Sequence, residues 1–188
     1  GLVGGAPIAS FIDPNTYGIG VFQFTYQVTG ILPCSDDVTT VSLTINPAPV
    51  VNTFTSSLAT VSQGSAVILT VDMTIGTPPF TINLTDDDIP SNPYVISITP
   101  PNMSGSVPAT PNFPPPITTY SIISIIDGNL CTAISALTVP VTVDPYPIID
   151  PFYTTDIDVC EGIIPSINMT LTQGEAPVTV DYSYNGVN

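Results

Sequence analysis

The sequence predicts an all-β chain built from tandem β-sandwich repeats of about 98 residues. The first observation is an internal repeat, since PAPVVNTF at residues 47–54 recurs as PYPIIDPF at residues 145–152, an offset of 98 positions. The second is apolar alternation with a period of two, which half-buried strands show. The third is that Pro or Gly interrupts nearly every window long enough to hold a helix. Such a repeat sets the architecture.

The repeat divides the chain into one complete unit and two half-units. The match at this offset extends in both directions, from TVSLTINPAPVV to GTPPFTI in the earlier copy and from TVPVTVDPYPII to GEAPVTV in the later copy. We therefore expect a complete unit at 47–144. The C-terminal half of a preceding unit would occupy 1–46, and the N-terminal half of a following unit would occupy 145–188. The chain is interpreted as a segment of a longer array.

Alternating apolar residues mark the strands of the complete unit in order. One face is apolar in SAVILTVDMTI, PFTINLTD, PYVISIT and LTVPVTVD, whereas both faces are apolar in TTYSIISIIDG, as expected of a central strand. Because Pro cannot donate a ladder hydrogen bond, the nitrogen of Pro140 should face an open edge or a bulge. The residues expected in the core are Val67, Leu69, Val71, Phe80, Ile82, Ile122, Val139 and Val141.

The Pro-rich segment at residues 99–119 is expected to cross between sheets as an extended loop with one poor edge strand. With it, the unit has about seven short strands separated by turn residues. This number and spacing are typical of an immunoglobulin-like sandwich. The predicted fold class is therefore all-β, with tandem immunoglobulin-like β-sandwich repeats.

The composition argues against several classes of function. The 188 residues contain no Lys, Arg or His, although a soluble chain of this length ordinarily has roughly 20 Lys and Arg. The usual catalytic bases, Schiff-base amines and imidazole metal ligands are therefore missing. A net charge of −15 repels nucleic acids and anionic membranes. No run of about 18 apolar residues is present for a membrane-spanning helix.

Carboxylates remain as candidates for catalysis, because glycosidases need only two of them at a set separation. The chain offers Glu161 and Glu175 besides its aspartates, with no basic or imidazole side chain to support them. Each acidic motif is also interpretable as a turn. We therefore expect a protein that is not an enzyme.

The densest acidic run is Asp86, Asp87 and Asp88, and Asp36 and Asp37 form a second pair. Hard oxygen ligands of this kind suit Ca²⁺, the one cofactor that the sequence suggests. The spacing differs from the Asp-x-Asp-x-Asp-Gly calcium loop, and the alternative that we favour is a solvated loop. Further aspartates gather around the second unit junction, namely Asp144, Asp150, Asp156 and Asp158.

Three cysteines form a sparse framework. Cys34 and Cys131 occupy matching places after the turns at Gly30 and Gly128, while Cys160 lies early in its unit. An early and a late Cys of one unit could bridge its two sheets, but the complete unit has a serine where Cys160 would match. Cys131 is expected either as a buried free thiol, which we favour, or in a disulfide with Cys160 across the junction. Zinc is disfavoured because it requires four ligands close together.

Three segments have residue patterns like those of a known class of repeats, namely GTPPFTINL, GEAPVTVDYSYNG and IIDGNLCTAISALTV. They resemble the immunoglobulin-like or PKD-like repeats of giant cell-surface adhesins and extracellular filament proteins that gliding Bacteroidetes-type bacteria export by type 9 secretion. The resemblance implies a non-enzymatic stalk or filament segment at the cell surface, used in adhesion. Its partners would be neighbouring repeats of the same chain. With few charges to repel one another, copies could also bundle laterally into a homo-oligomeric filament.

The alternative function is an adhesin module that binds carbohydrate or another ligand. Such a module needs exposed aromatic side chains, and the chain has no Trp, which leaves Tyr153, Tyr182 and Tyr184 as candidates. Asn-x-Ser/Thr triplets, which can accept glycans, begin at Asn83, Asn102 and Asn168 in numbers near chance, and alternation directs Asn83 and Asn168 to solvent.

Overall fold

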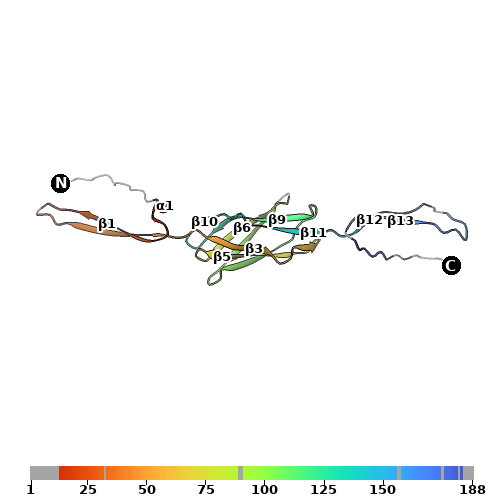
Figure 1. The fold of residues 1–188 in the computed structure, drawn as a ribbon, viewed down its shortest axis with the longest axis horizontal. Helices are drawn as coiled ribbons and strands as arrows, with labels where there is room; N and C mark the ends of the chain where they lie inside the picture. Colours follow the sequence, from red (N-terminus) through yellow and green to blue (C-terminus); the bar gives the residue numbers. More distant parts are fainter. Residues whose placement is uncertain are drawn as a thin grey trace.

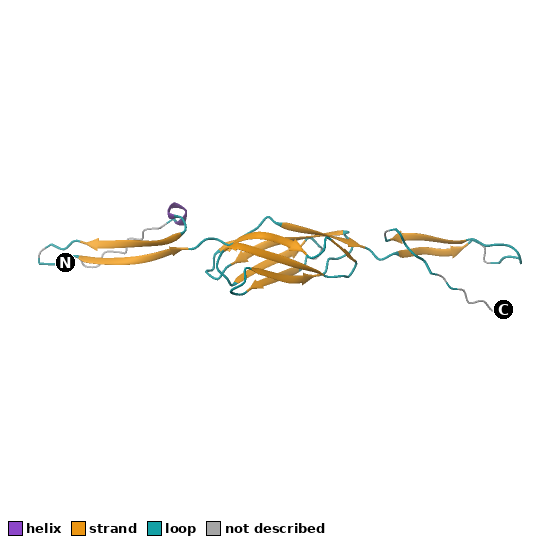
Figure 2. Cartoon of the chain, turned by 60° about the horizontal axis from the view of Figure 1, so that its bottom comes forward, coloured by secondary structure: helices purple, strands orange, loops and turns teal. Residues whose placement is uncertain are grey.

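A computed structural model shows three groups of strands that follow one another along the long axis of the molecule (Figures 1 and 2). The middle group forms a sandwich of two sheets, and a two-stranded hairpin lies at each end. The all-β prediction is therefore confirmed. The residues that the structure describes are 13–31, 33–88, 91–155, 158–174, 176–181 and 183.

The sandwich contains nine strands in two sheets. The larger sheet has the order β4-β11-β9-β6-β7, with β10 paired to β9, and the smaller has the order β3-β5-β8. Among the described strands, only β4 and β11 pair in parallel. The strands of the sandwich are β3 (Val50–Ser56), β4 (Thr60–Ser62), β5 (Val67–Ile75), β6 (Phe80–Asp86), β7 (Pro93–Ile98), β8 (Ser104–Ala109), β9 (Ile117–Ile126), β10 (Thr132–Ala133) and β11 (Thr138–Asp144). The hairpins are β1 (Gly20–Val28) with β2 (Asp37–Ile45), and β12 (Ile148–Thr154) with β13 (Ile167–Gln173).

The core lies between the two sheets of the sandwich. All eight residues predicted for it are buried, from 0 % exposed at Leu69 to 7 % at Val139. β9 has neighbours on both sides, as predicted for a central strand. Leu137, which alternation also directed inward, is instead exposed, because β11 begins only at Thr138.

Two predictions about prolines are confirmed. β8 pairs with β5 at the edge of the smaller sheet, so the Pro-rich segment crosses from the larger sheet through one edge strand. Thr142, two residues beyond Pro140, donates its N–H to the carbonyl of Ala59 at 2.9 Å, away from β9. Residues two apart in a strand direct their nitrogens to the same side. Because β4 pairs with β11 only from Thr142 onward, the Pro140 nitrogen faces an open edge.

One short helix was not predicted. The helix α1 (Pro14–Tyr17) is a single turn of four residues. Pro at its first position has no N–H to leave unpaired, and Thr16 donates its N–H to the carbonyl of Asp13 at 3.0 Å. A single turn is too short to show a helical period.

The N-terminal hairpin has one apolar and one polar face. Phe22 lies opposite Leu43, and Phe24 lies opposite Val41, while the intervening pairs consist mainly of Thr, Gln and Ser. Tyr17 packs edge-on against Phe22 and Phe24, with ring centroids 5.6 and 5.8 Å apart. The apolar face is the one that a second sheet would cover in a sandwich.

The register of this hairpin differs from that of β9 and β11 by two positions. Phe22 lies opposite Leu43, whereas Tyr120, the residue 98 positions after Phe22, lies opposite Val139, the residue 98 positions after Val41. A shift of two keeps each side chain on its own face, whereas a shift of one would turn it to the other face. The apolar faces therefore still correspond.

The C-terminal hairpin pairs in the register of β3 and β5, moved by 98 positions. Val50 lies opposite Ile75, and correspondingly Ile148 lies opposite Gln173. Every other pair recorded for β12 and β13 matches a pair of β3 and β5 in the same way, and the ladder is interrupted at corresponding places. The sequence repeat is thus accompanied by a repeat of strand pairing.

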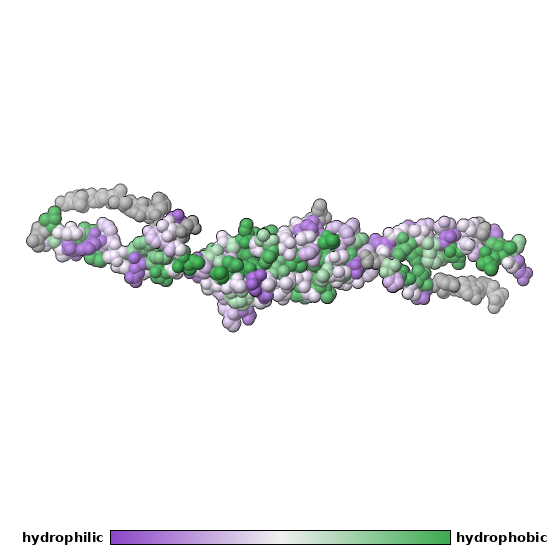
Figure 3. All heavy atoms as spheres, in the orientation of Figure 1, coloured by the Kyte–Doolittle hydropathy of each residue, from purple (hydrophilic) through white to green (hydrophobic). Residues whose placement is uncertain are grey.

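The face of this hairpin that corresponds to the sandwich core is uncovered. Phe152, Ile167, Met169 and Leu171 correspond to buried residues of β3 and β5, yet they are 62 %, 58 %, 42 % and 41 % exposed. Figure 3 shows apolar surface on this hairpin. A two-stranded hairpin alone cannot bury such a face.

Short Pro-x-Pro linkers join the three groups. Residues 46–49 connect β2 to β3, and residues 145–147 connect β11 to β12. At the second junction, Gln63 Oε1 accepts hydrogen bonds from Tyr146 N at 3.3 Å and Gln173 Nε2 at 3.4 Å. Gln173 Nε2 also donates to the Tyr146 carbonyl at 3.1 Å. We call these three residues the glutamine clasp, which ties the turn after β4 to the following hairpin.

Two matching glycines let a strand end lie against each linker. Gly76 and Gly174 have φ of +116° and +106°, where other residues are strained. A Cβ on Gly174 would lie 2.7 Å from Cα of Pro147, and one on Gly76 would lie 3.1 Å from Cβ of Pro49. Glycine is therefore required at both places by backbone angle and by space.

Candidate functional site

Asp86 lies at the end of β6 and accepts three hydrogen bonds. Asn92 donates its backbone N–H at 2.7 Å and its side-chain N–H at 3.0 Å. The Tyr94 hydroxyl donates at 3.1 Å. The side chain is 4 % exposed. Asp86 therefore fastens the connection between β6 and β7 to the end of β6.

Asp87 and Asp88 fasten two further segments. Asp87 Oδ1 accepts the backbone N–H of Thr119, in β9, at 2.7 Å. Asp88 is 5 % exposed and accepts hydrogen bonds from Asn112 Nδ2 at 2.9 Å and from the Thr118 hydroxyl at 3.3 Å. The three consecutive carboxylates thus tie the end of β6 to three different parts of the unit.

The interpretation of this run as a solvated loop is wrong for Asp86 and Asp88. Both are buried because the run continues an inward-facing strand, and polar side chains from other segments supply hydrogen-bond donors. Asp87 is the exposed member of the three. Across the described ranges, no group of three or more carboxylate, His or Cys side chains is placed to hold a metal ion.

Two tyrosines stand beside the buried carboxylates. Tyr120 lies opposite Asp86 in the pairing of β6 with β9. The ring of Tyr94 packs edge-on against the ring of Tyr120, with ring centroids 5.7 Å apart. Burial and then the Asp86 carboxylate raise the pKa of Tyr94 to about 12. Burial also raises the pKa of Tyr120, with Tyr94, Asp86 and Asp88 adding to the effect. The Tyr120 hydroxyl is buried and has no hydrogen-bond partner among the described residues, so the two tyrosine hydroxyls do not meet at hydrogen-bonding geometry.

The ionisation of Asp88 should make the stability of the unit depend on pH. Burial raises the pKa of Asp88, and the neighbouring Asp86 carboxylate adds to the effect. The folded state therefore binds the proton more readily than the unfolded state. This contribution to stability is complete below the ordinary aspartate pKa of about 4, and it is lost as pH rises through the raised pKa of the folded state.

Asp88→Asn should remove this pH dependence. An asparagine can still accept the hydrogen bond from Asn112, and it carries no charge to bury. We expect the unfolding free energy of the variant to increase relative to that of the wild type as pH rises from the ordinary aspartate pKa through the raised pKa of Asp88. Urea titrations followed by circular dichroism without divalent cations measure this difference, with Asp37→Asn as the exposed control. A difference that does not change with pH would contradict the expectation.

Asp127 is a third buried carboxylate, and sequence reasoning missed it. It is 3 % exposed and accepts backbone N–H groups from Thr77 at 3.1 Å, Asn129 at 2.9 Å and Cys131 at 2.9 Å. It fastens the turn between β9 and β10 to the turn between β5 and β6. The available signal was the Asp-Gly pair, because Asp side chains commonly accept the N–H two residues later in turns.

The three cysteines are free thiols in the structure. Cys131 is half-buried, while Cys34 and Cys160 are exposed, so the structure does not bring Cys131 and Cys160 together. Ser62, which matches Cys160, pairs with Asp144 at the far end of β11 from Cys131. β11 spans seven residues, or about 20 Å, and a disulfide requires Cα atoms within about 7 Å. An early and a late Cys of one unit therefore could not bridge.

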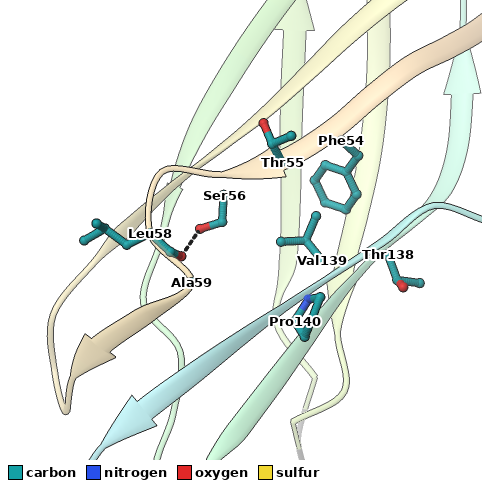
Figure 4. Close-up of a pocket in the computed structure, with 8 residues that line it drawn as sticks. All are labelled: Phe54, Thr55, Ser56, Leu58, Ala59, Thr138, Val139 and Pro140. Atoms are coloured by element: carbon teal, nitrogen blue, oxygen red, sulfur yellow. Dashed lines mark hydrogen bonds between the residues drawn. The ribbon is translucent and has the colours of Figure 1, made fainter.

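A groove lies where the chain passes from β3 to β4 (Figure 4). Its volume is about 320 Å³. Phe54 and Val139 face one another across it, and the Ser56 hydroxyl donates to the Leu58 carbonyl at 2.9 Å. Every residue that lines it is neutral: Phe54, Thr55, Ser56, Leu58, Ala59, Thr138, Val139 and Pro140. The groove therefore offers apolar contact and strand edges, with no group suited to acid–base chemistry.

The other candidate residues are dispersed. Asp36 Oδ1 accepts the N–H of Gly30 at 2.8 Å, and Glu161 is exposed. Asn83 donates to the Ser124 hydroxyl at 2.7 Å and is half-buried, so it does not project freely into solvent as alternation suggested. Those that lie outside the described residues are Asp156, Glu175, Tyr182 and Tyr184.

Comparisons with known proteins give no family for this chain. No protein-family model matches it, and no curated protein matches it. Among the described residues, no helix has the length and apolar character needed to cross a bilayer.

Proposed function

We propose that this chain is a non-enzymatic structural segment of a longer extracellular bacterial surface protein. In this proposal, immunoglobulin-like units stacked end to end form a stalk or filament that is used in adhesion. The observation that carries it is the recurrence of the β3–β5 pairing in β12 and β13 at an offset of 98 positions. A repeated sequence that also repeats its strand register is the mark of a modular array.

The strand order of the sandwich supports the immunoglobulin-like assignment. The smaller sheet contains the first, third and sixth strands of the unit, and the larger sheet places its central strand, β9, between β6 and the last strand, β11. In immunoglobulin-like sandwiches, likewise, the early strands and a later one form one sheet, and the final hairpin joins the other. On this proposal the hairpins β1–β2 and β12–β13 are the last and first hairpins of adjacent units.

The linkers support an extended and stiff arrangement. Each contains two prolines, and Pro-rich segments act as semi-rigid spacers. The glutamine clasp and the Gly174 contact with Pro147 add fixed contacts at the second junction. Length and stiffness are the properties that a stalk requires, and lateral bundling of such stalks is part of the proposal.

The alternative, an adhesin module that binds carbohydrate or another ligand, has less support. The features that favour this function most are two exposed tyrosines, Tyr153 on β12 and Tyr146 in the linker. The groove of Figure 4 is apolar and neutral, whereas sugar recognition needs polar groups that fix orientation. Screening the chain against a glycan array separates the two functions, since specific binding would favour the module.

Softening the second linker should shorten the molecule. We expect the double variant Pro145→Gly with Pro147→Gly to give a smaller maximum dimension in small-angle X-ray scattering, because glycine makes the linker flexible. Its circular dichroism should match that of the wild type. Pro33→Gly, in an exposed loop, is the matched control and should leave the scattering unchanged. A wild-type chain that is already compact would count against the stalk.

The surface role itself can be tested in the parent protein. Deleting residues 47–144 in frame removes one repeat length and should shorten the surface fibre seen by electron microscopy without preventing export. An unchanged fibre length would contradict the proposal.

A further inference from the structure

The buried carboxylates Asp86 and Asp88 lack any positive side chain to balance them. They are 4 % and 5 % exposed, and the whole sequence contains no Lys, Arg or His. Buried charges in proteins are almost always paired with opposite charge or bound to a metal ion. In this chain the balancing charge can come only from outside, as a proton or as a cation.

Both carboxylates keep free positions for a ligand. An ionised carboxylate offers about four lone-pair directions. Among the described residues, hydrogen bonds occupy three on Asp86, from Asn92 and Tyr94, and three on Asp88, from the backbone and side chain of Asn112 and from Thr118. Oxygen positions on both residues therefore remain available.

The Tyr120 hydroxyl is an independent indication of a ligand at this place. It is fully buried and has no hydrogen-bond partner among the residues that the structure describes, and an unsatisfied buried hydroxyl is unfavourable. Asp86 lies opposite Tyr120 in the strand pairing, and Asp86 and Asp88 are both near enough to raise the pKa of this hydroxyl. An oxygen that is buried without a partner beside two carboxylates has the chemistry of a cation ligand.

We propose that Asp86 and Asp88, together with the hydroxyl oxygens of Tyr94 and Tyr120, bind a hard cation of the Ca²⁺ class. All four ligands are oxygens, which suits Ca²⁺ and disfavours zinc. Their irregular arrangement suits Ca²⁺ better than Mg²⁺, which requires near-octahedral geometry. Water completes the coordination. Asp87 takes no part, because it is exposed and its carboxylate accepts the Thr119 N–H.

The site would brace one end of the sandwich. Asp86 holds the β6–β7 connection, and Asp88 holds the segment that precedes β9. A cation between them would join these segments directly, so binding should stabilise the folded state in proportion to the logarithm of cation concentration.

Terbium luminescence and thermal unfolding of the 188-residue chain test the site. Tb³⁺ replaces Ca²⁺ in oxygen sites and is excited through adjacent tyrosines, and no Trp is present to interfere. We expect tyrosine-sensitised emission that added Ca²⁺ displaces and Mg²⁺ displaces poorly. Ca²⁺ should also raise the melting temperature. Absence of both effects at millimolar Ca²⁺ would overturn the proposal and leave a proton as the balancing charge.

Tyr120→Phe gives a test with opposite signs in the two conditions. Without Ca²⁺, the variant should be at least as stable as the wild type, because it removes an unpaired buried hydroxyl. With Ca²⁺, the wild type should be the more stable of the two, because only it retains the ligand. An identical Ca²⁺ response in both proteins would contradict the assignment of Tyr120.

Asp88→Asn should weaken Ca²⁺ binding by at least about tenfold, because losing even an outer-shell partner of a metal ligand typically costs this much affinity. The exposed Asp37→Asn is the matched control, since it removes the same charge far from the site along the chain. An equal loss in both variants would show that Ca²⁺ responds only to net charge, and this would also overturn the proposal.

Discussion

Replacing Leu69 by alanine is expected to lower the unfolding free energy of the sandwich by about 2–5 kcal/mol. Leu69 is 0 % exposed within β5, and truncating a buried leucine removes its transfer free energy and leaves a cavity. A loss of this size is a large share of the total stability of a domain, which is about 5–15 kcal/mol. Urea unfolding followed by circular dichroism measures it.

The repeat supplies a matched control for this substitution. Ile167 of β13 lies 98 positions after Leu69 and is 58 % exposed in the 188-residue chain. Ile167→Ala should therefore change the stability by no more than about 0.5 kcal/mol, as is usual for exposed sites. Equal losses at the two positions would mean that the C-terminal hairpin is covered in solution. A negligible loss at Leu69 would contradict the sandwich core.

Trypsin should leave the whole chain intact even after unfolding. Its specificity pocket carries an acid that selects a basic side chain at the cleaved bond, and the chain contains no Lys or Arg. A chymotrypsin-like protease, which selects aromatic residues, should cut promptly at residues such as Tyr26, Phe152 and Tyr153, all of which are exposed. Gel electrophoresis and mass spectrometry after digestion in moderate urea measure both outcomes.

A single added lysine shows whether the protection lies in the sequence or in the fold. Asn102→Lys places one basic residue in an exposed turn. Trypsin should divide this variant into two fragments in urea, because cleavage of a folded domain follows its open population. Survival of the wild type against both proteases would instead mean that the fold provides the protection. Digestion of the wild type by trypsin would contradict the argument from composition.

Alternation predicted the core strands because each is long enough to show its period. β5 has nine residues, and its alternate side chains from Val67 to Met73 are buried. β4 has only three residues, and its parallel pairing with β11 depends on Thr142, far along the chain. A segment of three residues shows no period, and no local pattern specifies its distant partner. The crossing of β3 to β4 was therefore not predicted.

The candidate site was visible in the sequence only as an acidic run. Its burial depends on donors from Asn92, Asn112 and Thr118, which approach Asp86 and Asp88 only after the sheets form. The Tyr120 hydroxyl could not be predicted for the same reason, since a tyrosine in a core strand usually contributes packing alone. Nor does the acidic run behave as a unit, because Asp87 remains exposed although its two neighbours are buried.

The parallel pairing of β4 with β11 determines how the unit would bear tension. The chain enters the sandwich through β3 and leaves it through β11, toward the opposite ends seen in Figure 1. A pull on both ends would slide β4 and β11 along one another. Their hydrogen bonds, with that from Gln63 N to the Asp144 carbonyl at 2.8 Å, would then be loaded together, in shear. Bonds loaded together resist more force than bonds opened one at a time, so this short pairing would raise the force needed to unfold the unit.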